Sequence, residues 1–557
     1  MSKYTLGIDY GTLSGRAALV NVADGAIVAT AEYVYPHAIM GDCLPSGRRL
    51  EADWALQHPR DYLEVLDHVV PEVMKGINPA DVLGLGVDFT ACTVLPTDEK
   101  GYPLCFLPKY EDEPHAYVKL WKHHAAQPQA DRIEKLAKEM DMPFLRYFGG
   151  KLSCEWMFPK ILSTLEEAPE VYHDAAYFIE AGDWITWLLT GHQVRSYSLA
   201  AVKAYYIKGI GYPDKAFFKA LNPEFENVVE DKMNAPVQSQ GTAMGTLTPE
   251  WAARLGLSEK TIVSVAVPDA HGGVVASGLK DPGVMLSVMG TSACHMLLDH
   301  EIRFVPGAAG CLDSSMIPGL VGFECNQFQG DHYAWFVENC CPASYKEEAD
   351  KRGINLHQLL TEKAQQLKVG ESGLVAIDWW NGNRSILVDG QLSGFLMGMT
   401  LQTKPEEIYR AIIEATAFTT RVIVENFRAN GVAVNRMAAT GGISRKNPFV
   451  MQLFCDVTGL SLDVCGAKEG GAQGSAILAA GCVGSENGGY DCLNDAMNAM
   501  CPAPIASYTP NMENKKAYDA IYEEFVRLHD YFGRGGNDVM KRLKKIRRDV
   551  LEQKTEA

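Results

Sequence analysis

The stretch that decides the fold is Thr5–Val20, which reads TLGIDYGTLSGRAALV. An apolar run ends on the carboxylate Asp9, a Gly-Thr turn follows, and a second apolar run begins. Because Gly11 and Gly15 permit positive φ and close backbone approach, the pattern predicts a β-hairpin whose turn presents N–H groups to an anion. Asp9 lies where a carboxylate could hold Mg²⁺ beside that anion. Taken alone, the same pattern also fits a plain turn without a ligand.

The layout of this hairpin occurs a second time, about half a chain later. Val284–Leu298 reads VMLSVMGTSACHMLL, in which a Gly-Thr-Ser turn again separates two apolar runs. Turns of this kind can form concave groups of N–H donors that bind anions. Two related loops on two halves of the chain could therefore hold one nucleotide phosphate chain from both sides.

The composition indicates a globular protein with a sizeable core. The chain has 557 residues, of which 47% are hydrophobic and 22% charged. Its net charge of −18 disfavours broad affinity for nucleic acid or anionic membranes. No apolar run reaches the roughly 18 residues that a transmembrane helix needs. We therefore expect neither a nucleic acid nor a membrane as partner, while a local basic patch around an anionic substrate stays open.

The 14 cysteines are scattered, with no Cys-x-x-Cys pair and no secretion signal before the first strand. This usage predicts reduced thiols in a cytoplasmic protein. The adjacent pair Cys340-Cys341 is interpreted as two structural thiols near a helix end rather than a redox or metal pair. The sequence leaves open whether the chain forms a homodimer.

The order of apolar patterns suggests three parts, with bounds at residues 1–265, 266–490 and 491–557. The first hundred residues are interpreted as strand-rich, and residues 115–200 as mainly helical. Gly470-Gly471-Ala472 is interpreted as a turn before a helix at Gln473–Gly481. The tail, Lys515–Lys554, predicts amphipathic helices, and its basic run at residues 541–548 is interpreted as a solvated face rather than a binding patch.

At this point the chain resembles a known family, the FGGY carbohydrate kinases of the actin/Hsp70/sugar-kinase superfamily. The segment Gly394–Met399 (GFLMGM), followed after seven residues by Glu407–Glu414 (EIYRAIIE), is similar to the family's C-terminal signature. The two glycine loops, the Gly441-Gly442 turn and the Glu469–Ala476 segment occur in the family's order. The resemblance covers roughly residues 4–485.

The resemblance implies an α/β fold of two ribonuclease-H-like (actin-like ATPase) domains flanking a deep cleft. It implies sugar at the base of the cleft against the first domain, and ATP mainly on the second. Gly86–Thr93 (GVDFTACT) is similar to the members that act on L-ribulose, whereas many that act on xylulose or glycerol carry a Gly-Gln pair there. The expected reaction is phosphorylation of L-ribulose at O5 by ATP, in L-arabinose catabolism.

The resemblance also assigns roles to individual residues. Asp269 matches the family's base toward the ketopentose O5 hydroxyl, although its position before a helix-like stretch also suits a helix N-cap. Asp9, with Asp269, is expected to associate with Mg²⁺. The expected ATP-binding residues are Gly11, Thr12, Gly290, Thr291, Gly441, Gly442 and Asn447. The expected sugar-binding residues are Ala91, Trp121, Lys203, Asp269 and Glu324.

Each polar residue of this set also has a structural reading. Lys203 could be a surface lysine, Trp121 a core residue and Glu324 an ion-pair partner. Arg16, beside the first loop, could add charge at the phosphates or lie on the surface of its strand. Two other functions stay open: a kinase of this family for xylulose, ribitol or another polyol, and a non-catalytic sugar-sensing ATPase-fold protein.

Overall fold

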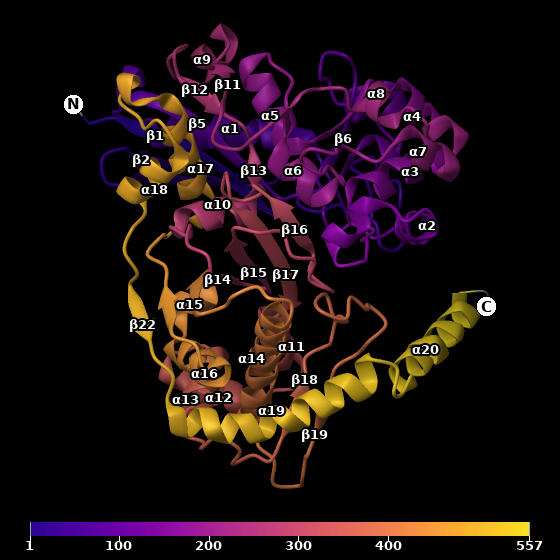
Figure 1. Cartoon of the computed structure of the whole chain (residues 1–557), viewed down its shortest axis with the longest axis vertical. Helices are drawn as coiled ribbons and strands as arrows, with labels where there is room; N and C mark the ends of the chain where they lie inside the picture. The colour runs from indigo at the N-terminus through magenta and orange to yellow at the C-terminus, as the bar shows by residue number, and fades with distance from the viewer. Residues whose placement is uncertain (1, 556–557) are drawn as a thin grey trace.

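The computed structural model describes residues 2–555 and contains two large β-sheets (Figure 1). In the first sheet, β1 pairs antiparallel with β2 and parallel with β5, in the registers expected of a hairpin followed by a crossover strand. The strands lie in the order β11 (Ala243–Thr246), β12 (Ile262–Ser264), β5 (Val82–Phe89), β1 (Tyr4–Tyr10), β2 (Ser14–Asn21) and β3 (Ile27–Val34), and β13 (Val267–Pro268) pairs with the end of β5.

The second sheet repeats this plan. Its hairpin strands β14 and β15 are antiparallel, β15 continues the meander into β17, and β14 pairs parallel with β20. The order is β16 (Gly310–Asp313), β17 (Val321–Phe328), β15 (Ser292–Asp299), β14 (Val284–Met289), β20 (Arg436–Thr440), β21 (Leu462–Val464) and β22 (Ala506–Tyr508). The prediction of two related hairpins on two halves is confirmed.

The two halves meet at two crossing helices, α10 (Asp269–Ala276) and α17 (Gly470–Val483). Helix α17 belongs to the second half in sequence, yet it packs on β1 and β5 of the first sheet. Glycine is required at this contact: a Cβ on Gly7 would lie 1.7 Å from the carbonyl oxygen of Ala472. Likewise, a Cβ on Gly474 would lie 1.9 Å from the carbonyl oxygen of Gly272. The helices therefore approach at backbone distance.

Successive residues of β1 point to opposite faces of the first sheet, so the strand contacts two different layers of the molecule. Leu6 and Ile8 pack with the helices α1 (Pro59–Val73), α5 (Ala181–Thr190) and α9 (Pro249–Leu255), while Gly7 faces α17. A separate core is built mainly from residues 92–233, with Met40, Leu44 and Leu56 from before β5, and it carries a small sheet, β4-β7-β6-β8. Its principal elements are β4 (Leu56–Gln57), β6 (Val94–Thr97), β7 (Val118–Lys119), β8 (Tyr177–Glu180), α2 (Gln127–Glu139), α3 (Met157–Glu167), α6 (Tyr197–Lys203) and α7 (Lys215–Leu221).

The second sheet is covered by helices that build the largest core of the described residues. These are α11 (Gly330–Asn339), α12 (Ala343–Arg352), α13 (Leu356–Ala364), α14 (Pro405–Ala429), α15 (Gly442–Lys446) and α16 (Pro448–Thr458). Helix α18 (Leu493–Met500) packs on α17, α19 (Met512–Gly533) packs on α16, and α20 (Val539–Thr555) runs out at the lower right of Figure 1. The helical tail was predicted.

The first hundred residues are strand-rich, as predicted, and contain β1 to β6. They also include the 15-residue helix α1, which was not predicted and whose His58 N-cap and proline at the first position form a regular helix start. One expectation about local structure is wrong. Gly470-Gly471-Ala472 is the first turn of α17 and not a loop, because α17 lies so close to the first sheet that side chains are excluded there. All 14 cysteines are free thiols. Among residues 2–555, no helix has the length and apolarity needed to cross a bilayer.

Candidate active site

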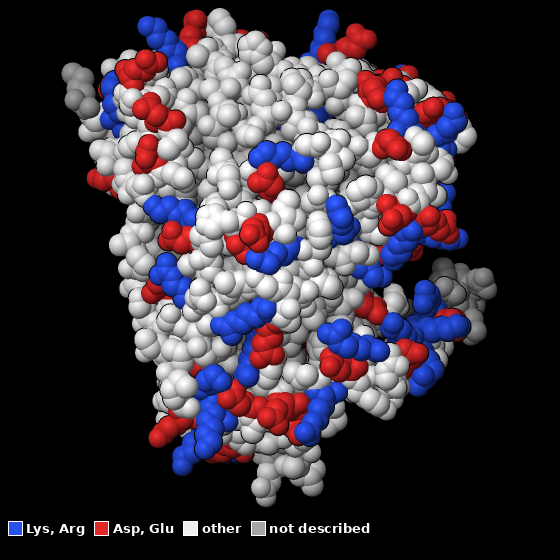
Figure 2. All heavy atoms as spheres, in the orientation of Figure 1, with Lys and Arg blue, Asp and Glu red and all other residues white. Residues whose placement is uncertain are grey.

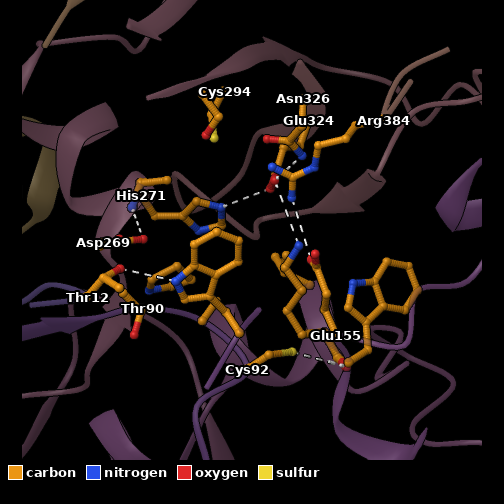
Figure 3. Close-up of a pocket in the computed structure, with 18 residues that line it drawn as sticks. Thr12, Thr90, Cys92, Glu155, Asp269, His271, Cys294, Glu324, Asn326 and Arg384 are labelled. Atoms are coloured by element: carbon orange, nitrogen blue, oxygen red, sulfur yellow. Dashed lines mark hydrogen bonds and ion pairs between the residues drawn. The ribbon is translucent and has the colours of Figure 1, made fainter. Parts of the chain in front are cut away.

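A cavity of about 180 Å³ lies between the two halves, beside the N-terminus of α10 (Figure 3). Both halves contribute walls, since its lining combines the ends of β5 and α6 with residues of β15 and β17. All five residues expected to bind sugar line this one cavity, although they are spread over more than 230 positions: Ala91, Trp121, Lys203, Asp269 and Glu324.

Polar groups converge on one wall of the cavity. Lys203 Nζ lies 3.9 Å from Glu324 Oε1, and His271 Nε2 lies 4.0 Å from Glu324 Oε2. Burial raises the pKa of Glu324, but Lys203 and then His271 outweigh this effect, so the net pKa lies below its ordinary value. Glu324 is therefore an ionised acceptor at neutral pH.

His271 brings an unused polar atom to this wall. Its Nδ1 contacts the Ser198 hydroxyl at 2.7 Å, while its buried Nε2 has no hydrogen-bond partner among the described residues. Burial lowers the pKa of His271 to about 4, so the ring is neutral. A buried polar atom without a partner costs free energy, and a ligand hydroxyl would satisfy it.

Asp269 is the first residue of α10, and its N-cap is Pro268. Its Oδ1 accepts a hydrogen bond from the backbone N–H of Ala270 at 2.7 Å. Burial, and then the negative charge of Asp9, raise the pKa of Asp269 to about 7. A carboxylate with a pKa near the working pH is suited to accept a proton from a hydroxyl group.

Asp9 lies beside a second buried carboxyl group, Asp88 at the end of β5. Ser475 of α17 donates to Asp88 Oδ2 at 2.6 Å, and no donor among the described residues reaches its buried Oδ1. Burial and the charge of Asp9 raise the pKa of Asp88 well above its ordinary value. The pKa of Asp9 is also raised, because it is removed from solvent. A Cβ on Gly471 would lie 2.8 Å from both carboxyl groups, so α17 begins directly against them.

Trp121 and Ala91 are fixed by contacts with other loops. The indole N–H of Trp121 donates to Thr12 Oγ1 at 3.2 Å, so its ring is held as a wall of the cavity. The fully buried Lys160 donates to the carbonyl oxygen of Cys92 and, at 2.8 Å, to that of Leu120. One ammonium group thus ties together the two segments that carry Ala91 and Trp121.

A second cavity of about 970 Å³ lies in the second half, between α11, α13 and α15–α16. Gly290, Thr291, Gly442 and Asn447 line it, as expected of ATP-binding residues. Of the other three, Thr12 lines the smaller cavity, whereas Gly11 and Gly441 line neither. Gly441 acts through its backbone: its φ of +95° and a Cβ position 2.4 Å from the Met289 carbonyl oxygen permit only glycine.

Each of the two glycine turns is closed by an internal backbone bond from its glycine amide, although the bond spans three residues in the first turn and two in the second. The amide of Gly11 donates to Ser14 O at 3.0 Å, and the amide of Gly290 donates to Ser292 O at 2.9 Å. These amides therefore close their own turns, which leaves the Thr12 and Thr291 hydroxyls as polar groups at the tips. Arg16 lies on the exposed side of β2 and pairs with Glu32 at 2.9 Å, as the surface alternative predicts.

Comparison with known proteins shows the family of the chain. Residues 4–276 match the model of the N-terminal domain of the FGGY family of carbohydrate kinases, and residues 285–481 match that of the C-terminal domain. The chain belongs to the FGGY family of carbohydrate kinases. ATP is therefore the expected co-substrate class of this chain, and its fold is the two-domain FGGY fold.

Curated FGGY relatives cover nearly the whole chain. It is 48% identical over 539 residues to a protein of Bacillus licheniformis named Ribulokinase, and the aligned residues cover 96% of this chain and 98% of that relative. It is also 48% identical over 550 residues to the Ribulokinase of Halalkalibacterium halodurans, covering 98% of each. Among solved structures, xylulose kinase from Rhodospirillum rubrum superimposes with a TM-score of 0.77 over 95% of this chain and 98% of that one, at 22% identity. The last comparison shows the fold alone.

Sequence reasoning missed several residues of the smaller cavity. Glu155, His271, Asn326 and Arg384 line it and carry most of its remaining polar atoms. Asn326 lies two positions from Glu324 on β17, where alternate residues share a face, so its spacing was a usable signal. His271 lies two positions from Asp269 on helix α10, where this spacing does not indicate a shared face. Glu155 and Arg384 stand in segments of irregular structure, where no periodicity indicates a direction.

Proposed function

We propose that this chain transfers the γ-phosphoryl group of ATP to O5 of L-ribulose, with Mg²⁺, giving L-ribulose 5-phosphate and ADP in L-arabinose catabolism. The observation that carries the proposal is the convergence of Lys203, Asp269 and Glu324 in one small cavity that lies between the halves. The name Ribulokinase on relatives that are 46–48% identical over nearly the full chain supports the choice of sugar.

The polar wall of the cavity suits a polyol. Glu324 accepts hydrogen bonds from two sugar hydroxyls, Lys203 donates to a carbonyl or hydroxyl oxygen, and His271 Nε2 takes a further hydroxyl. Every buried sugar hydroxyl then has a partner, which a site selective for hydroxyl groups requires. The Trp121 ring and the Ala91 backbone close the remaining sides.

Asp269 accepts the proton of the O5 hydroxyl as that oxygen attacks the γ-phosphorus. The bond from the γ-phosphorus to the bridging oxygen of ADP breaks, and the proton stays on the Asp269 carboxyl group until product leaves. Adenosine lies in the larger cavity, beside Gly442 and Asn447. The hydroxyls of Thr12 and Thr291 donate to the phosphate oxygens from the two halves. In phosphoryl transfer, such positioning supplies most of the catalysis.

Asp9 and Asp269 fit a divalent cation. The negative charge of Asp9 raises the pKa of Asp269, and it also raises the pKa of neighbouring Asp88, so the three carboxyl groups repel one another. A cation near Asp9 would relieve that repulsion, and oxygen ligands are those that Mg²⁺ prefers. When bound, Mg²⁺ would neutralise phosphate charge.

We also infer a division into a sugar-binding part at residues 1–265, a nucleotide-binding part at 266–490 and a helical tail at 491–557. The 14 free thiols support a reducing compartment such as the cytoplasm. A homodimer stays a prediction that size-exclusion chromatography with light scattering would decide.

The proposed function is tested by ADP release measured with a panel of ketopentoses and pentitols. We expect ADP release to depend on added sugar and Mg²⁺, with the highest kcat/KM for L-ribulose. A higher kcat/KM for xylulose or ribitol would show that this sugar, and not L-ribulose, is the preferred substrate. ADP release that ignores every sugar would contradict a kinase and favour the sensing function.

A further inference from the structure

Arg384 enters the sugar cavity from the second half, on a loop that follows β18 (Val375–Ile377). Its Nη2 lies 3.5 Å from Oε2 of Glu155, which belongs to the first half (Figure 3). The other oxygen of Glu155, Oε1, lies 3.1 Å from Nε2 of His124. The pair therefore spans the cavity from one half to the other.

The surroundings of the pair favour its charged form. Burial raises the pKa of Glu155, but the charge of Arg384, the hydrogen bond with His124 and the charge of Lys203 outweigh this and hold the pKa at about 2. The Arg384 guanidinium also lies over the ring of Phe328, 5.4 Å from its centroid. Both side chains are largely removed from solvent, with exposures of 25% and 19%, so salt screens the pair less than an exposed one.

The loop that carries Arg384 has little regular structure of its own. Asn383 and Asp389 exchange both backbone hydrogen bonds, at 2.8 and 3.0 Å, and this closes a short loop. On the adjoining side, a Cβ on Gly533 at the end of α19 would lie 2.3 Å from Leu387, so the tail packs directly against the loop.

The basic helix α20 completes the support of this loop. Lys541 pairs with Asp389 at 2.7 Å, and Lys544 Nζ donates to the carbonyl oxygens of Gly390 and Leu392 at 2.8 Å each. Figure 2 shows basic side chains gathered around α20 at the lower right. Lys541 and Lys544 contact the loop, whereas the exposed Lys545 pairs with Asp549 of the same helix and Arg548 is exposed. The basic run is thus more than a solvated face.

We propose that the Glu155–Arg384 ion pair closes the sugar cavity across the two halves, and that α20 positions Arg384 by holding its loop. The inference rests on the proposed function, because it concerns the sugar affinity of the same site. Arg384 is a positioning residue: it fixes Glu155 and the two cavity walls rather than a reacting atom. The C-terminal tail thereby sets sugar affinity from outside the cavity.

The pair is tested by a double-mutant cycle with Glu155→Gln, Arg384→Gln and the double variant. We expect each single variant to raise the sugar KM about tenfold, with kcat and the ATP KM changed less than about twofold. The sugar KM of the double variant should not exceed that of the more strongly affected single variant, because the two side chains act as a unit. Additive losses, or an equal rise in both KM values, would overturn the pair.

The tail is tested by the double variant Lys541→Ala/Lys544→Ala. Its matched control is Lys545→Ala/Arg548→Ala, which removes the same charge from the exposed side of α20. We expect the first to raise the sugar KM about threefold and the control to leave it unchanged. Combined with Arg384→Gln, the first should add nothing further. An equal effect of both double variants, or no effect of either, would overturn the role of α20.

The two proposals fail in distinguishable ways. The substrate of the unmodified chain tests the proposed function, and the ratio of variant to wild-type KM for that preferred sugar tests the ion pair. Titration calorimetry of the sugar without ATP gives the ratio of variant to wild-type Kd with no turnover. Arg384→Lys keeps the charge without the planar fork, so it should recover part of the lost affinity. If Arg384→Lys lost as much sugar affinity as Arg384→Gln, that result would contradict an ionic role for Arg384.

Discussion

The two cavities of this protein differ in size and in origin. The smaller, of about 180 Å³, is walled by both halves and lined by paired charges, while the larger, of about 970 Å³, belongs to the second half alone. Sugar selectivity requires a partner for every hydroxyl, which a small enclosed site provides. A nucleotide is larger and needs positioning more than discrimination. Under the proposed function, the difference implies that sugar selectivity depends on how the two halves meet.

Asp269→Asn is expected to have the largest effect of these variants, and it should separate catalysis from sugar binding in the smaller cavity. The amide cannot take the O5 proton, so kcat should fall by about 10²–10⁴. Sugar affinity should change little, because Lys203 and Glu324 remain. Rapid-quench kinetics gives the first quantity and titration calorimetry the second. A kcat near the wild-type value would remove Asp269 as the base, and loss of both folding and binding would make it structural.

Glu324→Gln should separate the two cavities. The amide cannot satisfy Lys203 and the sugar hydroxyls together, so sugar affinity should fall by roughly 1–3 kcal/mol, or about 5- to 160-fold. Affinity for a non-hydrolysable ATP analogue should stay unchanged, because Glu324 does not line the larger cavity. The matched control is Glu301→Gln at an exposed ion pair with Arg303. Equal losses for sugar and nucleotide would contradict this separation.

The pH dependence follows from the raised pKa of Asp269, about 7. Only the ionised form accepts a proton, so kcat/KM for sugar should fall tenfold per pH unit below about 7. The contribution of Asp269 to the stability of the fold changes with pH in the opposite direction. A carboxyl group whose folded pKa lies above its ordinary 3.8 stabilises the fold fully below pH 4 and loses this contribution as pH rises through 7. Asp269→Asn should therefore raise Tm at pH 8 relative to wild type, and a lower Tm there would contradict the shift.

The nucleotide cavity is tested by Asn447→Ala. Asn447 lines that cavity and caps α16, accepting from Val450 N at 3.2 Å. We expect the ATP KM to rise by about three- to tenfold, with about 1 kcal/mol lost from stability through the cap. Asn511→Ala, which removes the cap of α19 away from both cavities, is the matched control for the stability loss. A changed sugar KM would contradict the independence of the two sites.

How much the sequence predicts depends on whether a residue belongs to a repeated local pattern. The hairpin at β1–β2 and its copy at β14–β15 follow from apolar alternation around Gly-Thr turns, and their pairing is as expected. Helix α1 was not predicted, because its start signal at His58-Pro59 was overlooked within a strand-rich stretch. The helical state of Gly470 was not predicted because glycine favours turns, and only close packing between α17 and the first sheet explains it.

The candidate site divides in the same way. Lys203, Asp269 and Glu324 were named from motifs, and they lie together in one cavity. Glu155 and Arg384 belong to segments without periodicity, 229 positions apart (384 − 155), and only the meeting of the two halves brings them together. A contact of this kind depends on tertiary packing, which local sequence patterns do not predict.

The smallest expected effect is a change of shape on binding both ligands. Thr12 lies at the sugar cavity and Thr291 at the nucleotide cavity, on turns of different halves. Both hydroxyls can reach one triphosphate only if the halves approach, and the backbone contact between α10 and α17 is the place where they can pivot. Closure would also exclude water, so ATP hydrolysis without sugar should be slow. Small-angle X-ray scattering should show a smaller radius of gyration with L-ribulose and a non-hydrolysable ATP analogue together than with either alone. An unchanged radius, with sugar-independent ATP hydrolysis at the kinase rate, would show that the meeting of the two halves does not gate phosphoryl transfer.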